Sequence, residues 1–370
     1  MLNNSYISYL KREININPTD RLLLHLFFSD TVTQEDVDTL LSDYEIDNAR
    51  LEFTFLVALL RKKHPEIQFP KPIIPRLEGV LRFFHHKNAT LLQGFNEVGR
   101  QLNERGIPIL LIKGAAMRYF RPNEPRYMFD VDFLVPDELY DEAVQLAIDL
   151  GFSGDPSFHS TDLDKGSAAV DIHRLFIREE KEPHKDILKR MFRNAQKVSA
   201  FGVDVLIPSQ EDFLLMMMNN AYHNIAVQPP LHLGAYYHFF DCARIIEDHR
   251  NLNWDAIFET ASEAEILYRI WVYLELLNWV LPSFLPEGLL AKIPMNEESM
   301  NESVEKDIFF KVNDRLFVQQ KTSKLSKCKN LSDVVFALKV RIERPIFYIV
   351  RKIPVLRFLY LNKILKTKAS

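Results

Sequence analysis

The sequence has 370 residues, of which 47% are hydrophobic, 26% charged and 12% aromatic, with a formal net charge of -4 at pH 7. This composition excludes an intrinsically disordered chain, and the length favours two domains over one. The two cysteines, Cys242 and Cys328, form no CxxC pair, which argues against a structural zinc site or a disulfide framework. The first residues lack the basic flank and apolar run of a signal peptide, and the most apolar long window, Ile266 to Leu285, carries Arg269 and Glu275. We therefore expect a cytoplasmic protein.

Residues 1 to about 90 are predicted to be helical. Asp20 to Phe28 and Gln34 to Tyr44 place apolar residues at helical spacing, and Thr33 is available as a cap. Four prolines between Pro65 and Pro75 indicate a break within this region.

Strand and helix patterns alternate between residues 91 and 208. An amphipathic helix over Leu91 to Asn103 precedes the apolar run 107–112, which is followed at once by Lys113-Gly114 and a helix-forming stretch to Phe120. A later helix begins at Pro136 and is closed by Gly151. The further predicted strands are Tyr127 to Val135, Ala168 to Phe176 and Val203 to Ile207. This alternation predicts an α+β fold, with flanking helices around a mixed sheet.

The remainder of the chain is predicted to form a helical domain over 209–320 and a basic, aromatic tail over 321–370. The tail carries 13 Lys or Arg residues against only Asp333 and Glu343. Such a segment can bind an anionic partner, either RNA, a membrane surface or an acidic protein, or it can be a helix that packs its apolar stripe and extends its lysines into water. The predicted parts are thus a helical N-terminal region (1–90), a sheet core (91–208), a helical domain (209–320) and the tail (321–370).

Asp130 and Asp132 lie in the predicted strand that runs from Tyr127 to Val135. Residues two apart share one face of a strand, so the two carboxylates point together while Val131 and Phe133 enter the core. Two like charges on an apolar strand are unfavourable unless a cation lies between them. Mg²⁺, which prefers hard oxygen ligands, is the expected cation, and Mn²⁺ is the alternative. The competing interpretation, an exposed strand with alternating acids, fits the apolar flanks less well.

Asp171 is a third acid between apolar residues on another predicted strand. Three carboxylates from two neighbouring strands can hold a pair of metal ions about 3.5–4 Å apart, which would clamp the attacking and leaving oxygens of a phosphoryl displacement. Asp171 would also help to deprotonate the attacking hydroxyl. Asp130, Asp132 and Asp171 are therefore the candidate catalytic and metal-binding residues.

These motifs together resemble the uncharacterised nucleotidyltransferase family of the polymerase-β-like superfamily. The resemblance rests on Ile112-Lys113-Gly114, a helix ending in Tyr119-Phe120, an arginine, the Asp-x-Asp strand ending in Val135, and the Asp-x-His pair at Asp171. It extends to Ser209 to Leu215, His223, Asp241 and Trp254-Asp255, and covers about Leu91 to Pro282. It implies a mixed sheet followed by a helical domain, a divalent metal, and transfer of a nucleoside monophosphate from an NTP to an acceptor hydroxyl with release of pyrophosphate.

The glycine turn departs from the superfamily pattern, which usually has Gly-Ser or Gly-Gly. Here Ala115 follows Gly114, so a hydroxyl that often meets the triphosphate is missing. Gly114 would still let backbone N–H groups approach a phosphate at a helix start, and Lys113 could add a point charge. Alternatively, Gly114 is only a tight turn and Lys113 only a solvated strand end.

Two more residues are candidate nucleotide-binding groups. Arg126 has the bidentate donors suited to a β- or γ-phosphate, although it could equally be a surface loop arginine. His173 shares the face of Asp171 and could orient that carboxylate, touch the substrate or be a structural histidine. Asp241 is expected to make a structural pairing, with Arg244 as one candidate partner, and metal ligation by His223 or His238 is not expected.

The primary hypothesis is a nucleotidyltransferase whose acceptor is a small molecule, an RNA or a protein. A second hypothesis is a nucleotidyltransferase-like module that has lost catalysis and binds a partner, which Ala115 would favour. A third is a nucleic-acid or membrane-surface binder acting through the basic tail.

Overall fold

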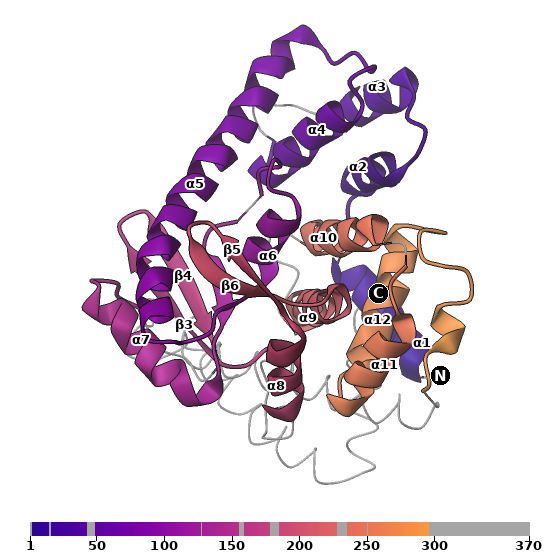
Figure 1. The fold of residues 1–370 in the computed structure, drawn as a ribbon. Helices are drawn as coiled ribbons and strands as arrows, with labels where there is room; N and C mark the ends of the chain where they lie inside the picture. Colours follow the sequence, from indigo (N-terminus) through magenta and orange to yellow (C-terminus); the bar gives the residue numbers. More distant parts are fainter. Residues whose placement is uncertain are drawn as a thin grey trace, which may run out of the picture.

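A computed structural model describes residues 2–14, 16–42, 49–126, 128–154, 159–177, 185–227, 235–249 and 251–295. Within these residues, one six-stranded sheet lies beside a group of helices drawn from both ends of the chain (Figure 1). None of the described helices is both long and apolar enough to cross a bilayer. The expected basic tail, 321–370, lies outside the described residues.

The helices before the sheet are α1 (Leu2–Ile14), α2 (Pro18–Phe28), α3 (Gln34–Ser42), α4 (Leu51–Lys63), η1 (Lys71–Ile73) and α5 (Ile74–Glu104). The strands are β1 (Leu110–Leu111), β2 (Val131–Leu134), β3 (Ser160–Lys165), β4 (Ala168–His173), β5 (Gln196–Ala200) and β6 (Val203–Ile207). Between them lie α6 (Lys113–Phe120), η2 (Asp137–Leu139), α7 (Tyr140–Asp149) and α8 (Lys185–Asn194). The helices after the sheet are α9 (Gln210–Tyr222), the π-helical turn η4 (His223–Val227), α10 (Ala235–Asp248), α11 (Trp254–Glu263), α12 (Leu267–Val280) and η5 (Leu290–Lys292).

The sheet is mixed, with the strand order β3-β4-β2-β1-β6-β5. β2 runs parallel to β4 and β1 parallel to β6, whereas the pairs β1–β2, β3–β4 and β5–β6 are antiparallel. The predicted α+β class and mixed sheet are therefore confirmed. The two outermost strands, β3 and β5, were not predicted, because at the rims of the sheet they carry polar residues in place of a long apolar run.

Helix α5 packs along one face of the sheet, beside α7 (Figure 1). Its Phe95 ring meets Phe133 of β2 at 5.5 Å between centroids, which places Phe133 on the α5 side. Since side chains alternate along a strand, Asp132 faces the opposite side. We expected a region boundary near residue 90, but α5 runs unbroken through it. The helix continues because buried residues at helical spacing extend from Leu77 to Leu102.

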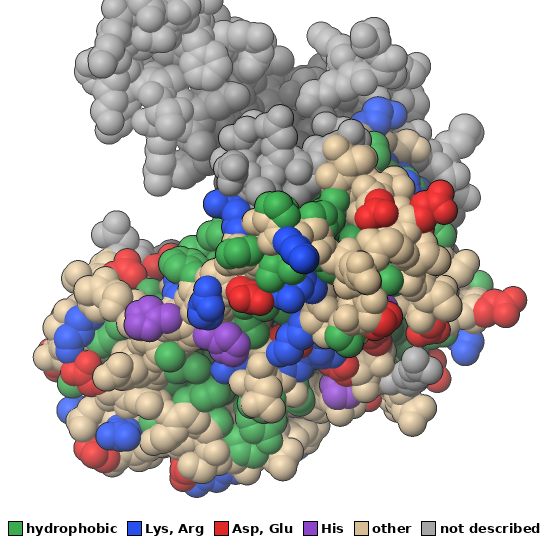
Figure 2. All heavy atoms as spheres, turned by 90° about the horizontal axis from the view of Figure 1, so that it is seen from above, with side chains coloured by type: hydrophobic (Ala, Val, Ile, Leu, Met, Phe, Trp, Pro, Cys, Tyr) green, Lys and Arg blue, Asp and Glu red, His purple; other side chains and the backbone are tan. Residues whose placement is uncertain are grey.

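Helices α9, α10 and α12 pack together on the side of the sheet away from α5, and α1 and α2 join them from the other end of the chain. The predicted cap at Ser209 is confirmed, since its side chain accepts a hydrogen bond from the Asp212 N–H at 3.1 Å. On the face shown in Figure 2, basic and acidic side chains are interspersed. The described residues visible on this face therefore form no large patch of a single charge.

Candidate active site

Three acidic residues form a row across the sheet on the face opposite α5. Asp132 of β2 is in register with Asp171 of β4, and Asp171 is in register with Asp162 of β3. Residues directly opposite each other in neighbouring strands point to the same side. The register therefore brings together two predicted residues and adds Asp162, which lies on a strand that we did not predict.

His173 connects the two central carboxylates. Its Nε2 lies 2.7 Å from Oδ2 of Asp171 and 3.2 Å from Oδ1 of Asp132. All three side chains are buried. Of the alternatives considered for His173, the geometry supports the one in which it orients the carboxylates.

Lys113, two residues after the end of β1, brings a positive charge to this group. Its Nζ lies 2.5 Å from Oδ1 of Asp132, 3.2 Å from Nε2 of His173 and 3.8 Å from Oδ2 of Asp171. Lys113 is thus an ion-pair partner of the acids and not a solvated strand end.

The turn that carries Lys113 differs in detail from the expected glycine turn. The left-handed backbone conformation falls on Lys113, with φ of 46°, and not on Gly114. A non-glycine residue in this region costs on the order of 1 kcal/mol, a strain often found at functional sites. Gly114 instead lies close to the next segment, since a Cβ there would lie 3.1 Å from Cβ of Met128, which is tighter than an ordinary contact. Ala115 is fully buried, so a hydroxyl at this position would face the protein interior.

Asp130 lies just before β2 and lines the same cleft as Asp132 and Asp171. Among the described residues it makes no hydrogen bond or ion pair. Burial, followed by the charge of Asp132, raises the pKa of Asp130 to about 7. A carboxyl group with this pKa changes its charge close to neutral pH.

Attraction to Lys113 and His173 keeps the carboxylates of Asp132 and Asp171 in their charged form. Burial alone would raise the pKa of Asp132, but the Lys113 charge and the His173 hydrogen bond outweigh it, and the pKa falls below its ordinary value. The pKa of Asp171 is lowered in the same way, chiefly by the hydrogen bond from His173. Burial and the Lys113 charge oppose protonation of His173, yet its bonds to both carboxylates raise its pKa. The carboxylates of Asp132 and Asp171 are therefore held in their charged form beside the Lys113 ammonium.

These side chains open into a cleft of about 550 Å³ between the sheet and the helical side. Helices α9 and α10 contribute Asn219 and His238 to its wall. Burial, with the nearby charges of Arg126 and Lys113, lowers the pKa of His238 to about 4, so this histidine is neutral. Neither Asp162 nor His238 was among the residues predicted for the site. The alternating residues of β3 could have indicated Asp162, but nothing in the sequence places α10 against the sheet.

Arg126 does not line this cleft. Both of its terminal nitrogens bind the carboxylate of Asp241 on α10, and the Asn88 side chain of α5 bonds to its backbone N–H at 2.7 Å and to its carbonyl at 3.0 Å. Asp241 is thus in a structural pairing, as expected, but its partner is Arg126.

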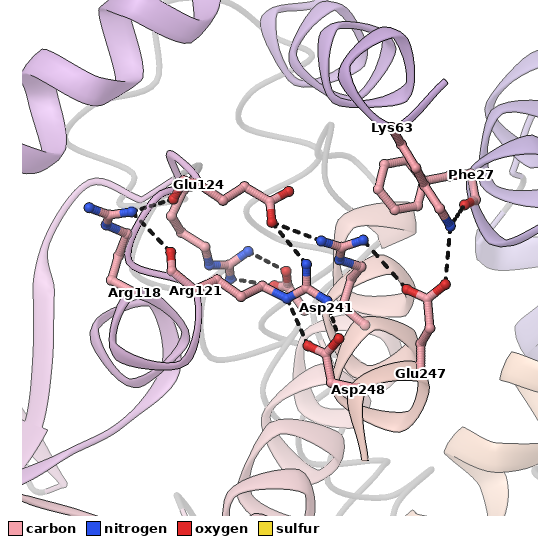
Figure 3. Close-up of polar contacts among 10 residues, drawn as sticks. Phe27, Lys63, Arg118, Arg121, Glu124, Asp241, Glu247 and Asp248 are labelled. Atoms are coloured by element: carbon pink, nitrogen blue, oxygen red, sulfur yellow. Dashed lines mark hydrogen bonds and ion pairs between the residues drawn. The ribbon is translucent and has the colours of Figure 1, made fainter. Parts of the chain in front are cut away.

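The Arg126–Asp241 pair belongs to a network of charges between α10 and the loop after α6. Arg121 binds both Asp248 and Glu124, and Glu124 is also bound by Arg244 (Figure 3). The guanidinium groups are therefore engaged with carboxylates. The structure thus places Arg126 in the support of the site.

Asp132, Asp171 and His173 fit a divalent cation. Each of these side chains offers one ligand atom, and the three atoms lie within 4.8 Å of one another. Oδ1 of Asp171 is buried and has no hydrogen-bond partner among the described residues, so it remains available as a further ligand or proton acceptor. The group formed by Asp132, Asp171 and His173 thus contains a histidine nitrogen where we expected the carboxylate of Asp130.

Comparison with solved structures gives distant matches, two of them at 15% identity. One is the antibiotic-resistance factor ANT(2'')-Ia, with a TM-score of 0.35 over 48% of this chain and 93% of that one. The other is a tRNA nucleotidyltransferase complexed with a primer tRNA and an incoming ATP analog, with a TM-score of 0.21 over 74% of this chain and 100% of that one. At these scores neither likeness bears on substrate or mechanism. A search of curated proteins gives no match.

The family model described as "Uncharacterised nucleotidyltransferase" matches residues 53–282. This range includes all six strands, α5 and the helices that wall the cleft, and it begins earlier than the resemblance seen in the sequence. The chain therefore belongs to the uncharacterised nucleotidyltransferase family.

Proposed function

We propose that the protein transfers a nucleoside monophosphate from an NTP to an acceptor hydroxyl and releases pyrophosphate. The observation that carries this proposal is the register of Asp132 and Asp171 on adjacent parallel strands, with His173 bonded to both. Membership of the nucleotidyltransferase family supports the same reaction class.

Asp132, Asp171 and His173 would hold the divalent cation, with Asp130 beside them, and Mg²⁺ or Mn²⁺ suits a set rich in carboxylate oxygens. When bound, the cation would neutralise charge that develops on the triphosphate. The acceptor oxygen forms a bond to the α-phosphorus while the bond to the bridging oxygen of the leaving pyrophosphate breaks. Oδ1 of Asp171, which has no hydrogen-bond partner among the described residues, would take the hydroxyl proton.

Lys113 and the first turn of α6 would face the triphosphate. The first N–H groups of a helix have no acceptor within the helix, and the helix dipole favours an anion there. Gly114 would keep the backbone in close contact with Met128, which fixes the start of α6. The acceptor, whether a small molecule, an RNA or a protein, would enter the cleft between the sheet and α9.

Labelled NTPs test the reaction directly. Wild-type protein is incubated with Mg²⁺, cell extract and each of ATP, GTP, CTP and UTP, and the release of pyrophosphate and the mass of labelled products are measured. Asp132→Asn should lower pyrophosphate release by at least about a hundredfold. Asp204→Asn is the matched control, because Asp204 is an exposed acid on β6 outside the cleft and should behave as wild type. If millimolar NTP with Mg²⁺ does not bind to the wild-type protein at all, the proposed reaction is wrong.

A further inference from the structure

Lys113 contacts all three residues of the candidate metal group. Its Nζ lies 2.5 Å from Oδ1 of Asp132, 3.2 Å from Nε2 of His173 and 3.8 Å from Oδ2 of Asp171. Nε2 of His173 lies 3.2 Å from the same Asp132 oxygen and 2.7 Å from the same Asp171 oxygen, and one ligand atom from each of the three residues lies within 4.8 Å of the other two. The ammonium group is therefore placed where it neutralises both carboxylates.

We propose that the Lys113 ammonium and a divalent cation use the same position, so that Lys113 must withdraw before the cation can bind. This inference rests on the proposed function, which supplies the cation. A divalent ion lies about 2.0–2.2 Å from its oxygen or nitrogen ligands. An ion bonded to Oδ1 of Asp132 would thus be at most about 4.7 Å from Nζ, which is itself 2.5 Å from that oxygen. An ammonium group has no lone pair, so it can only repel the ion at this distance.

The cleft gives Lys113 a place to move. Its side chain is 30% exposed, although the carboxylates that it binds are nearly fully buried, and it lines the cleft of about 550 Å³. A triphosphate in that cleft offers the ammonium a new anionic partner. Binding of the triphosphate and of the cation therefore favour each other, because the cation requires the state in which Lys113 has left the carboxylates and the triphosphate stabilises that same state.

Measurement of Mn²⁺ binding tests this exchange without reference to activity. Free Mn²⁺ is measured by electron paramagnetic resonance in titrations of wild-type protein, with and without inorganic triphosphate, and a titration without protein corrects for the Mn²⁺ that triphosphate itself binds. Wild-type protein should bind Mn²⁺ weakly alone and more tightly with triphosphate. Lys113→Met should bind Mn²⁺ alone about tenfold more tightly or better, and triphosphate should enhance its binding less. Lys113→Gly suits the left-handed backbone at this position and should give the same result if Lys113→Met folds poorly.

Lys87 provides the matched control. Its ammonium lies 3.4 Å from the ring centroid of Phe129 and is close enough to Asp130 for the two charges to attract, but it contacts none of the three ligand atoms. Lys87→Met removes the same charge from the vicinity and should change Mn²⁺ affinity by no more than about threefold.

The possible outcomes are distinct. If both Lys113 variants bind Mn²⁺ but no more tightly than wild type, or if Lys87→Met tightens binding as much as they do, the shared position is wrong while the metal-dependent function stands. If neither wild type with triphosphate nor either Lys113 variant binds Mn²⁺, the metal site fails and the proposed function fails with it.

Discussion

Replacement of Arg126 by Met should lower the free energy of unfolding, because Arg126 is paired with Asp241 behind the site. It should have little effect on NTP binding. Arg126 forms a bidentate pair with Asp241, its guanidinium lies 5.4 Å from the Tyr237 ring centroid, and its backbone is held by Asn88. The side chains of Arg126 and Asp241 are only 13% and 4% exposed, so water screens their attraction little. Removal of one partner from a buried pair costs about 3–5 kcal/mol, because the remaining charge is left without compensation.

The cost should depend on pH in a defined direction. Burial raises the pKa of Asp241 above its ordinary value even when Arg126 is present, and without Arg126 it should rise further. A carboxyl group whose pKa is raised on folding contributes stability below the unfolded pKa and loses it as pH rises through the folded pKa. Arg126→Met should therefore be more stable relative to wild type at pH 5 than at pH 8.

Urea denaturation followed by circular dichroism at both pH values measures these differences. The double variant Arg126→Met/Asp241→Leu should recover part of the loss, because it leaves no unpaired buried charge. If Arg126→Met stays within about 0.5 kcal/mol of wild type and instead weakens NTP binding, Arg126 is a phosphate ligand and the structural role is refuted.

Three further predictions concern the cleft and its supports. Asp130→Asn should lower activity at least about a hundredfold. Its free energy of unfolding at pH 8 should stay the same or rise slightly, because the substitution removes a carboxylate that is repelled by Asp132. A clear loss of stability would contradict this. The pKa of His238 falls to about 4 on folding, so its stabilising contribution of about 3 kcal/mol is present above pH 6.5 and is lost as pH falls through 4. His238→Asn should therefore flatten the pH dependence of the unfolding free energy measured by urea denaturation. An unchanged pH profile would disprove this role of His238. Gly114→Ala should lower the free energy of unfolding by about 1–2 kcal/mol through contact with Met128. At Gly79 on α5 an added Cβ would meet nothing within 4 Å, so Gly79→Ala should stabilise the protein slightly. Equal effects of the two substitutions in calorimetry would reject this explanation.

The central strands could be predicted because their local pattern is strong. The predicted strand over Val203 to Ile207 is confirmed with the same bounds, and β2 and β4 lie inside their predicted ranges. Their apolar residues are buried against helices, so burial and β-branching appear directly in the sequence. Strand β1 is shorter than predicted, and β3 and β5, at the edges of the sheet, have too few apolar residues to be recognised in this way.

The spacing of Asp130, Asp132, Asp171 and His173 within their own short segments was sufficient to identify the candidate chemistry, since side-chain alternation along a strand is a local property. Which of these residues touch is a property of the register between β2 and β4, two strands that are far apart in the sequence and whose pairing depends on the whole sheet. The same holds for Arg126, because its partner Asp241 is on a helix that only tertiary packing brings against the loop after α6. The local sequence pattern thus determined which residue types form the site and which strand face each occupies. The contacts of Lys113, Asp162 and Arg126 were decided by long-range packing. Such packing joins segments that are distant in the sequence and therefore produces no periodic pattern within any one of them.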